Sequence, residues 1–491
     1  MLTNSQHSHF FSIFLMIKLQ TNISTFISTP DIFFREHLLK KKSFSKRSGL
    51  IYKKLVSCSK TQSKQDDCKE WLDSILSVRY PTKKEYLDKW RKVAINLIKG
   101  MPFPSKSDES WRLTSLDKVY GMRFSKEEND NSVFDLEDQL NKYKGPKIVF
   151  VNGTYSEKFS DLSNLNEKLV LDELGNFPDK HIENILEFLS KGESGINGGF
   201  FPTLNIACLS DIYVLSIPPQ LQIDMPINVI YVGSNQSSAI ALNHRLVIIS
   251  ESDSKSKIIE HHISKNQPEY FDNTAISILV KENSTLDFLL VNESSGKSIF
   301  INSIHAEIKE FSRFNFSSIS MGGLFSRVNL GIDINGTECE CSVKGISVAN
   351  NKQTTDFHSR ISHNLPNSQS SQLQKMLLTD EAHGVFAGKI QVQHGAGNTN
   401  SDQLCKTLLL SSRSRIDSLP ILEINNENVK CTHGSTVSDL DKNQLFYLQS
   451  RGIPESEAKK LLTIGFVNEM INDYGDQIKS KITKKLEFLM K

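Results

Sequence analysis

Two residues near the C-terminus combine donor types and a spacing that could do chemistry. In Val429-Lys-Cys-Thr-His433, apolar and polar residues alternate as in a strand, which places Cys431 and His433 on one face about 7 Å apart. A thiolate and an imidazole at that distance could bind the same soft metal ion or sulfur species. Two ligands do not complete a tetrahedral site, so a closed site would need groups from another chain. A packed cysteine beside a hydrogen-bonded histidine is the alternative interpretation.

The other thiols and imidazoles are weaker candidates. Cys339 and Cys341 share an apolar row with Val343, so we expect them to be buried as small hydrophobic side chains. Four histidines stand in polar stretches without a third ligand at metal-binding spacing, and we expect them to be solvated loop residues. They are His261, His262, His358 and His363, and His305 is ambiguous.

The familiar catalytic motifs are missing from the sequence. Gly296-Lys297-Ser298 does not qualify as a phosphate-binding loop, because Val291 stands where such a loop needs a glycine. There is no Gly-x-Ser-x-Gly elbow, no His-Glu-x-x-His and no dinucleotide fingerprint after a strand. The seven cysteines include no Cys-x-x-Cys pair, which argues against a zinc ribbon or a disulfide framework and suits a reducing compartment.

Length and composition indicate a soluble globular chain of several units. The 491 residues suggest about three domains. Hydrophobic residues make up 38% and charged residues 23%, so a sizeable core can be buried. The 58 basic residues nearly balance 56 acidic ones, for a net charge of +2. That balance singles out neither nucleic acid nor an acidic membrane as a partner.

Residues 1–65 differ from the rest in composition. They hold eleven Lys or Arg, eleven Ser and only two acids, Asp31 and Glu36. This composition is typical of an organelle transit peptide, and an over-extended start or a disordered tail is the alternative. The most apolar piece, residues 10–17, is far shorter than the roughly 20 residues that a membrane-spanning helix needs. We therefore predict a leader outside the fold and no transmembrane helix.

Three segments follow the leader. Residues 66–145 carry apolar residues at three- and four-residue spacing, such as Trp71, Leu72 and Ile75, which predicts an N-terminal helical domain. Residues 146–437 contain many short alternating stretches, which predict a long β domain without long helices. Residues 438–491 are predicted to be helical again, with a capping start at residues 438–441 and a left-handed cap at Gly452.

The clearest predicted strand runs from Val328 to Ile334, where apolar and polar residues alternate. Asn335-Gly336 then predicts a turn, because both residues tolerate positive φ. Residues 350–374 are rich in Asn, Gln, Ser, Thr and His, and we interpret them as a surface excursion. No strict repeat emerges that would choose among a sandwich, a propeller and a solenoid.

Six motifs in fixed order over about 70 residues near the C-terminus resemble the SufB/SufD family of iron–sulfur cluster assembly scaffolds. A seventh, Glu109-Ser-Trp-Arg-Leu-Thr-Ser115, is similar to the N-terminal motif of the family. The resemblance thus extends from about residue 70 to the end of the chain. The six are Gly384-Val-Phe-Ala-Gly-Lys-Ile390, Asp402-Gln-Leu404, Leu408-Leu-Leu-Ser411, Pro420-Ile-Leu-Glu-Ile424, Val429-Lys-Cys-Thr-His-Gly-Ser435 and Asp441-Lys-Asn-Gln-Leu-Phe-Tyr-Leu-Gln-Ser-Arg-Gly-Ile453.

Within the family, the sequence is more similar to the SufD branch. SufD-like chains carry a Lys-Cys-Ser/Thr-His-Gly pattern before the terminal helices, where SufB-like chains have a Val-Glu-His-Glu type of stretch. This chain has Lys430-Cys-Thr-His-Gly434 there. It also lacks the Ser-Thr-Tyr-Phe-Arg segment near the N-terminus of SufB-like chains.

The resemblance implies a mainly β fold, a right-handed parallel β-helix flanked by helical domains. It implies a scaffold that is not itself an enzyme, assembled with SufB-like and SufC-like subunits, of which SufC is the ATPase. Cys431 and His433 correspond to the interface with SufB, where a cluster or iron would be held only transiently, and no stably bound cofactor is expected. The SufC-docking region corresponds to Gln444, Leu445, Phe446, Tyr447, Arg451 and Gly452.

Two other functions remain as alternatives. One is a SufB-type sulfur-accepting scaffold, against which the Lys-Cys-Thr-His pattern argues. The other is a β-helix enzyme acting on polysaccharide, which should show acidic residues clustered near a basic residue on one β face, and no such cluster is visible in the sequence. The expected location is the cytoplasm, as in a cyanobacterium, or the plastid stroma if residues 1–65 are a transit peptide.

Overall fold

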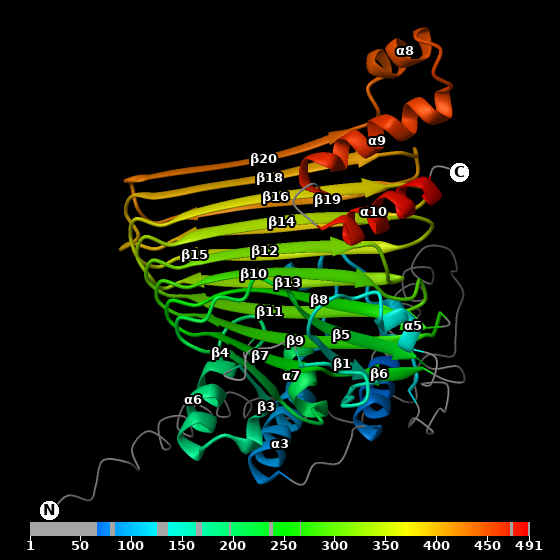
Figure 1. Ribbon diagram of the computed structural model, residues 1–491. Helices are drawn as coiled ribbons and strands as arrows, with labels where there is room; N and C mark the ends of the chain where they lie inside the picture. The colour runs from blue at the N-terminus through cyan, green and yellow to red at the C-terminus, as the bar shows by residue number, and fades with distance from the viewer. Residues whose placement is uncertain are drawn as a thin grey trace, which may run out of the picture. The chain divides into compact units, whose positions relative to one another are not determined.

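The computed structural model describes residues 66–78, 84–124, 136–163, 169–195, 198–234, 239–265, 267–471 and 475–489. The predicted leader, residues 1–65, lies outside the described residues. From residue 66 onward, most of the chain forms a parallel β-solenoid of two facing sheets, with helices near its N-terminal and C-terminal ends (Figure 1). The prediction of a mainly β, parallel β-helix fold flanked by helices is confirmed.

The two sheets are built from alternate strands of the chain. From β8 onward, each strand lies in the opposite sheet to the one before it, so two strands make one turn. Sheet A is β2 (Thr154–Tyr155), β1 (Lys147–Val151), β5 (Ile227–Ser234), β8 (Lys255–Lys265), β10 (Thr285–Glu293), β12 (Arg313–Ser320), β14 (Glu340–Ala349), β16 (Gln369–Leu378), β18 (Thr399–Leu409) and β20 (Val429–Ser438). Sheet B is β19 (Arg415–Ile424), β17 (His383–Val392), β15 (Thr354–His363), β13 (Phe325–Ile334), β11 (Ile299–Ile308), β9 (Tyr270–Val280), β7 (Arg245–Ser250), β4 (Tyr213–Ile217) and β3 (Val170–Glu173), with β6 (Ile240–Leu242) beside β9.

Each turn repeats the one before it after about 30 residues. Thr285 pairs with Arg313, Arg313 with Glu340, and Glu340 with Gln369. At one corner, successive turns place a non-glycine residue at positive φ, and its N–H donates to a carbonyl of the next turn, as Asn283 does to Glu310. The corner residues that make this bond are Asp253, Asn283, Phe311, Asn367 and Asn398, and Glu338 has the same positive φ.

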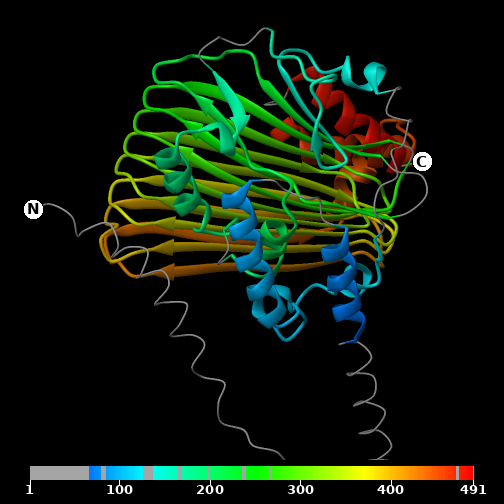
Figure 2. The ribbon, with the colours of Figure 1, turned by 90° about the horizontal axis from the view of Figure 1, so that it is seen from below.

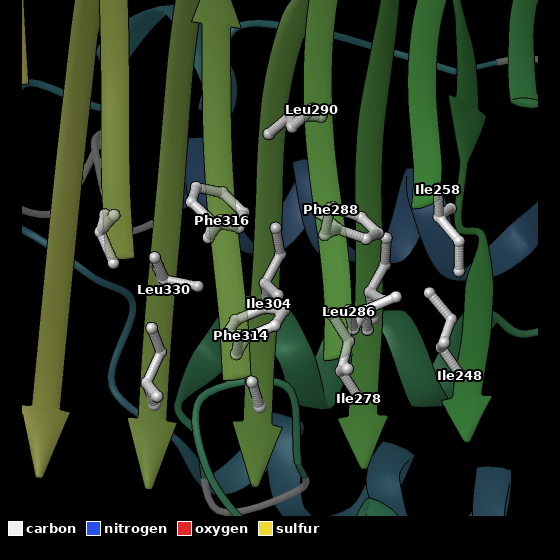
Figure 3. Close-up of a cluster of buried hydrophobic side chains, with 14 of the residues drawn as sticks. Ile248, Ile258, Ile278, Leu286, Phe288, Leu290, Ile304, Phe314, Phe316 and Leu330 are labelled. Carbon is white, nitrogen blue, oxygen red and sulfur yellow. The ribbon is translucent and has the colours of Figure 1, made fainter. Parts of the chain in front are cut away.

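The space between the sheets is a hydrophobic core in most turns. Inward side chains from sheet A, such as Leu286, Phe288 and Phe316, meet those of sheet B, such as Ile278 and Leu330 (Figure 3). Alternation along each strand accounts for this, because every second residue points inward. Cys339 and Cys341 belong to the same core and are buried, as the sequence predicted.

Helices cover the outer face of sheet B near the N-terminal turns (Figure 2). Trp71 is fully buried there and packs edge-on against Phe271 of β9. The helices are residues 66–77, α3 (Glu85–Gly100), η1 (Glu109–Trp111), α4 (Asp117–Tyr120), η3 (Leu174–Asn176), α6 (Asp179–Leu189) and α7 (Phe200–Cys208). The short helix α5 (Glu137–Leu140) packs instead on the outer face of sheet A, where Leu140 meets Val149 and Ile230.

Helices α6 and α7 lie within residues 146–437, where the sequence predicted short strands without long helices. Every residue of α7 is buried. It is mostly apolar, and its polar residues Thr203 and Asn205 are buried as well. The helix therefore lacks an exposed polar face, and its periodicity does not separate it from a buried strand.

Two ion clusters fix the N-terminal segments to sheet B. Arg327 of β13 lies over the ring of Trp111, with its guanidinium carbon 3.7 Å from the ring centroid, and pairs with Asp356 of β15 at 3.0 Å. Farther along the face, Glu193 binds Arg360 of β15 through both carboxylate oxygens, at 2.5 and 3.0 Å. Burial raises the pKa of Glu193, but hydrogen bonds from His305 and Arg360 outweigh it and hold that pKa at about 2.

Three helices follow β20 directly: α8 (Lys442–Ser450), α9 (Glu455–Ile471) and α10 (Asp476–Leu489). Of these, α9 and α10 pack on the outer face of sheet A, and no residue of α8 is buried. Val467 and Met470 of α9 meet an apolar patch on β10 to β18 that includes Ile346 and Leu377. No helix in the described ranges is long and apolar enough to span a membrane.

The predicted surface excursion at residues 350–374 is wrong. Residues 350–374 contain all of β15 and the first six residues of β16. Its serines and glutamines alternate in the strand register and point into the solenoid, where they bond one another, as Ser370 does to Ser401 at 2.6 Å. The polar composition of this segment suggested a surface loop. In the structure these polar residues line the interior of the solenoid instead.

Candidate functional site

The last turn of the solenoid is open. Among the described residues, β20 pairs only with β18, and β19 only with β17. No residue of either strand is buried, in contrast to the strands beneath them. Each of the two strands is ten residues long, so each sheet ends in a long edge strand (Figure 1). Within the described residues, one side of the backbone of each edge strand has no strand partner.

Cys431 and His433 lie on this terminal strand, two residues apart. They stand directly over Ser401 and Gln403 of β18, which are buried inside the solenoid. Since successive turns stack in register, Cys431 and His433 face the end of the solenoid interior. The predicted strand and the shared face of Cys431 and His433 are therefore present. The structure also shows that this face lies at the open end of the solenoid interior.

The backbone of these residues also belongs to the open edge. In a parallel ladder, alternate residues direct both backbone groups toward the same neighbouring strand. The N–H of Asn400 in β18 donates toward β16, to Ser368. The alternation then directs the amides of Cys431, His433 and Ser435 away from β18 and toward the open edge.

The thiol and the imidazole differ in exposure. Cys431 is half-buried beside Ile390 and Val392 of β17, and burial raises the pKa of its thiol. His433 is exposed. The strand is also tied to the opposite sheet, because Ser435 donates a hydrogen bond to Ser418 of β19 at 2.8 Å.

The two side chains together offer one sulfur and one imidazole nitrogen. Within the part of the chain that the structure describes, no group of three or more His, Cys, Asp or Glu side chains is placed to hold a metal ion. Thiolate and imidazole suit iron and sulfur species. The arrangement can therefore supply part of a site at an edge where a second chain could supply the rest.

The predicted docking residues gather on and just after α8. Asp441 caps this helix by accepting hydrogen bonds from the amides of Asn443 and Gln444, so the cap is Asp441 and not the predicted Ser438, which still belongs to β20. The side chains of Phe446 and Tyr447 are 71% and 57% exposed. Gln444 is also exposed, and Leu445 is half-buried.

After α8, Arg451 places its guanidinium over the ring of Tyr447 at 5.3 Å. Gly452 has a φ of 84° and ends the helix, as predicted. Only residues 439–441 separate β20 from α8, so the candidate docking helix and the strand that carries Cys431 are directly connected.

Hydrogen bonds and ion pairs to sheet A hold the helices that follow α8. Lys375 of β16, only 3% exposed, donates to the carbonyl of Phe466 and to the carboxylate of Glu469 on α9, both at 2.6 Å. Lys481 of α10 pairs with Glu293 of β10 at 2.5 Å. These contacts hold α9 and α10 on sheet A, and α8 extends from the N-terminal end of α9.

The prediction of solvated loop histidines is wrong. All of them lie on strands, and His261, His262, His305 and His363 are buried. His262 lies between Glu260, at 2.5 Å, and Asp272, at 2.8 Å. Burial lowers the pKa of His262, but the two carboxylates outweigh it and raise that pKa to about 9. His358 lies 2.9 Å from Asp356, and His363 lies 2.9 Å from the hydroxyl of Ser370, so polar side chains of the fold surround these histidines.

Sequence reasoning missed the polar interior beneath the candidate site. Gln372, Gln374 and Gln403 are buried inside the solenoid. The available signal was the pair of strand-interior glycines, Gly345 and Gly388, since glycine within a strand often marks a close approach by another group. Composition alone could not show that these glutamines point inward.

The chain matches two models of one protein family. Residues 231–466 match the SUF system FeS cluster assembly SufBD core domain, and residues 78–229 match the SufBD protein N-terminal region. An iron–sulfur cluster assembly SufBD family protein of Synechocystis is 28% identical over 78% of this chain and 86% of its own length. The chloroplastic protein ABCI7 of Arabidopsis thaliana is 26% identical over 83% and 86%, and SufD of Bacillus subtilis 26% over 79% and 90%.

The exposure and pKa of Cys431 predict how it reacts with iodoacetamide. In the folded chain we expect Cys431 to be alkylated slowly at pH 7 and increasingly fast above pH 9, because burial raises its pKa and only the thiolate attacks. Cys405, one turn below, is buried with its pKa raised to about 11 and should stay unmodified. Peptide mass mapping measures both, with Cys431→Ser as the control. Equal labelling of both thiols, or a rate at Cys431 that is already maximal at pH 7, would contradict the described environment.

Proposed function

Since the chain belongs to the SufBD family of SUF-system iron–sulfur cluster assembly proteins, we propose that it is a SufD-like scaffold subunit. In this proposal it docks a SufB-like subunit at the open last turn and a SufC-like ATPase at α8. A cluster is then assembled at the first of these contacts. The chain itself catalyses no ATP hydrolysis.

The observation that carries the proposal is the position of Cys431 and His433 on an unpaired sheet edge. A long edge strand is a ready template for pairing with another chain. Ile424 and Val437 add exposed apolar side chains to the two edges, at 40% and 51% exposure. A partner that pairs with β19 or β20 would bring its own groups next to the thiol and the imidazole.

Iron and sulfide are cargo in this proposal. Thiolate and imidazole bind both iron and iron–sulfur clusters, and an incomplete donor set on this chain suits a species that is held briefly and passed on. Cys431, with its raised pKa, would become a thiolate when iron or a positive charge from the partner arrives.

The ATPase role falls to a partner because the chain has no phosphate-binding loop. Phe446 and Tyr447 on α8 offer an exposed aromatic surface of the kind that often anchors protein interfaces. The connection of α8 to β20 through residues 439–441 would let a change at the ATPase contact reach the cluster site.

The SufD branch is preferred over the SufB branch on Lys430-Cys-Thr-His-Gly434. Proteins named SufD are among the relatives, in Bacillus subtilis and in Escherichia coli, the latter 23% identical over 76% of this chain. A SufB-type scaffold is the second candidate. The chloroplastic and cyanobacterial relatives support a plastid stroma or a cyanobacterium-like cytoplasm as the location.

Replacing His433 by alanine tests the cluster-assembly role. We expect the variant to assemble with SufB-like and SufC-like subunits but to form clusters at about one tenth of the wild-type yield or less, a loss typical when a metal site loses a supporting group. The yield is measured by absorbance and by iron and sulfide content after anaerobic reconstitution.

The matched control is His394→Ala, because His394 is an exposed histidine on the corner loop after β17. It should form clusters at the wild-type yield. A normal yield from an intact complex containing His433→Ala would refute the assigned role of that residue.

Replacing Phe446 by aspartate tests the docking role of α8. We expect affinity for the SufC-like subunit to fall at least about tenfold, because a charged group replaces an aromatic anchor, while the urea midpoint stays unchanged since the side chain is exposed. Phe311→Asp is the control, because Phe311 is another phenylalanine with high exposure, 63%, and lies on a solenoid corner. Calorimetric titration measures the affinity of each variant for the SufC-like subunit. Equal affinities of the two variants would show that α8 is not part of the proposed interface.

A further inference from the structure

The interior of the solenoid changes character toward its open end. In the middle turns it holds stacked aromatic rings, such as Phe288 and Phe316 with centroids 6.0 Å apart. On the sheet A side of the later turns, polar side chains replace them. These inward residues are Ser370, Gln372, Gln374, Ser401, Gln403, Cys405 and Thr407.

Two of these glutamines and a serine of sheet B form a series of hydrogen bonds across turns. The Nε2 group of Gln403 donates to Oε1 of Gln372 at 2.8 Å. The Nε2 group of Gln372 donates in turn to the hydroxyl of Ser359 on β15 at 2.7 Å. All three are buried, with Gln403 only 2% exposed. This series of hydrogen bonds fixes the plane of the Gln403 amide from the side of β16.

Glycines make room for the glutamine side chains. A Cβ atom at Gly388 of β17 would lie 2.1 Å from Nε2 of Gln403, and a Cβ atom at Gly345 would lie 1.8 Å from Oε1 of Gln374. Glycine inside a strand weakens the strand by lost entropy and lost packing. Gly388 therefore lowers the stability of its strand, and the space that it leaves holds the side-chain amide of Gln403.

The remaining atom of this amide has no partner. Oε1 of Gln403 is buried and accepts no hydrogen bond from any described residue. Because Nε2 points toward β16, the opposite side of the planar amide points toward β20. The residue paired with Gln403 on β20 is His433, whose side chain lies on the same inward face.

We propose that Gln403 is a positioning residue for His433. Its amide oxygen accepts a hydrogen bond from one ring N–H of His433, which selects one tautomer and leaves the lone pair of the other nitrogen for iron or a sulfur species at the open end. Histidine ligands are commonly oriented by such a bond on their second nitrogen. This inference rests on the proposed function of His433.

Two variants test the proposal in the assembled complex with its SufB-like and SufC-like subunits. Gln403→Met keeps the volume and removes the acceptor, and Gly388→Ala displaces Gln403 without altering it. For each we expect an unchanged urea midpoint of the isolated chain, an intact complex and a cluster yield reduced about tenfold. In the double variant we expect no further loss, because both changes act through the same amide.

The imidazole of His433 provides a readout that a purely structural role would not change. In the wild-type complex, its ¹⁵N chemical shifts should report one dominant tautomer, and in Gln403→Met a mixture of two. Gly345→Ala is the control, because it displaces Gln374, which pairs with Cys405 and not with Gln403, and it should change neither yield nor tautomer.

Failure of this proposal is distinguishable from failure of the proposed function. If His433→Ala abolishes cluster formation while Gln403→Met and Gly388→Ala leave yield and tautomer unchanged, Gln403 has no positioning role and the proposed function stands. If His433→Ala has no effect, the function assigned to His433 fails, and with it the inference. Additive losses in the double variant would also overturn the inference, because the two changes would then act separately.

Discussion

Backbone pairing between successive turns is the interaction on which this structure depends. A parallel solenoid satisfies the N–H and C=O groups of each turn with those of the next, so every turn is stabilised by its neighbours and the two ends are special. At the N-terminal end, the sheets finish in the two-residue β2 and the four-residue β3, both antiparallel to their neighbours. Short edges of this kind discourage further pairing. At the other end, β19 and β20 keep their full length.

The asymmetry of the two ends explains where the chemistry lies. Helices α9 and α10 cover the outer face of sheet A and do not extend the last turn, so the end of the interior reaches the surface at β20. The interior beneath the open end is polar, and the glutamine chain of Gln372 and Gln403 runs there, below His433. A polar interior contributes less to stability than an apolar one, and its location beneath the open end is consistent with a functional site there.

Alternation within single strands was readable from the sequence. The row from Val328 to Ile334 and the shared face of Cys431 and His433 follow from the two-residue period of a strand. What could not be read were contacts that depend on register between turns. His262 became an ion-paired core residue because Asp272, on the next strand, meets it at 2.8 Å. The solenoid repeat also lacks a strict sequence motif, since its corner accepts Asn283, Phe311 and Asn367 alike.

β20 is an edge strand because the stack of turns ends with it. Hydrogen–deuterium exchange at single-residue resolution tests this position most directly. The amides of Cys431, His433 and Ser435 point away from β18, so the account predicts fast exchange in the isolated chain and strong protection once a SufB-like subunit binds. The amides of Lys430, Thr432 and Gly434, which point toward β18, should be protected in both states. Unchanged fast exchange at Cys431, His433 and Ser435 in a stable complex would contradict the claim that a partner chain closes this edge.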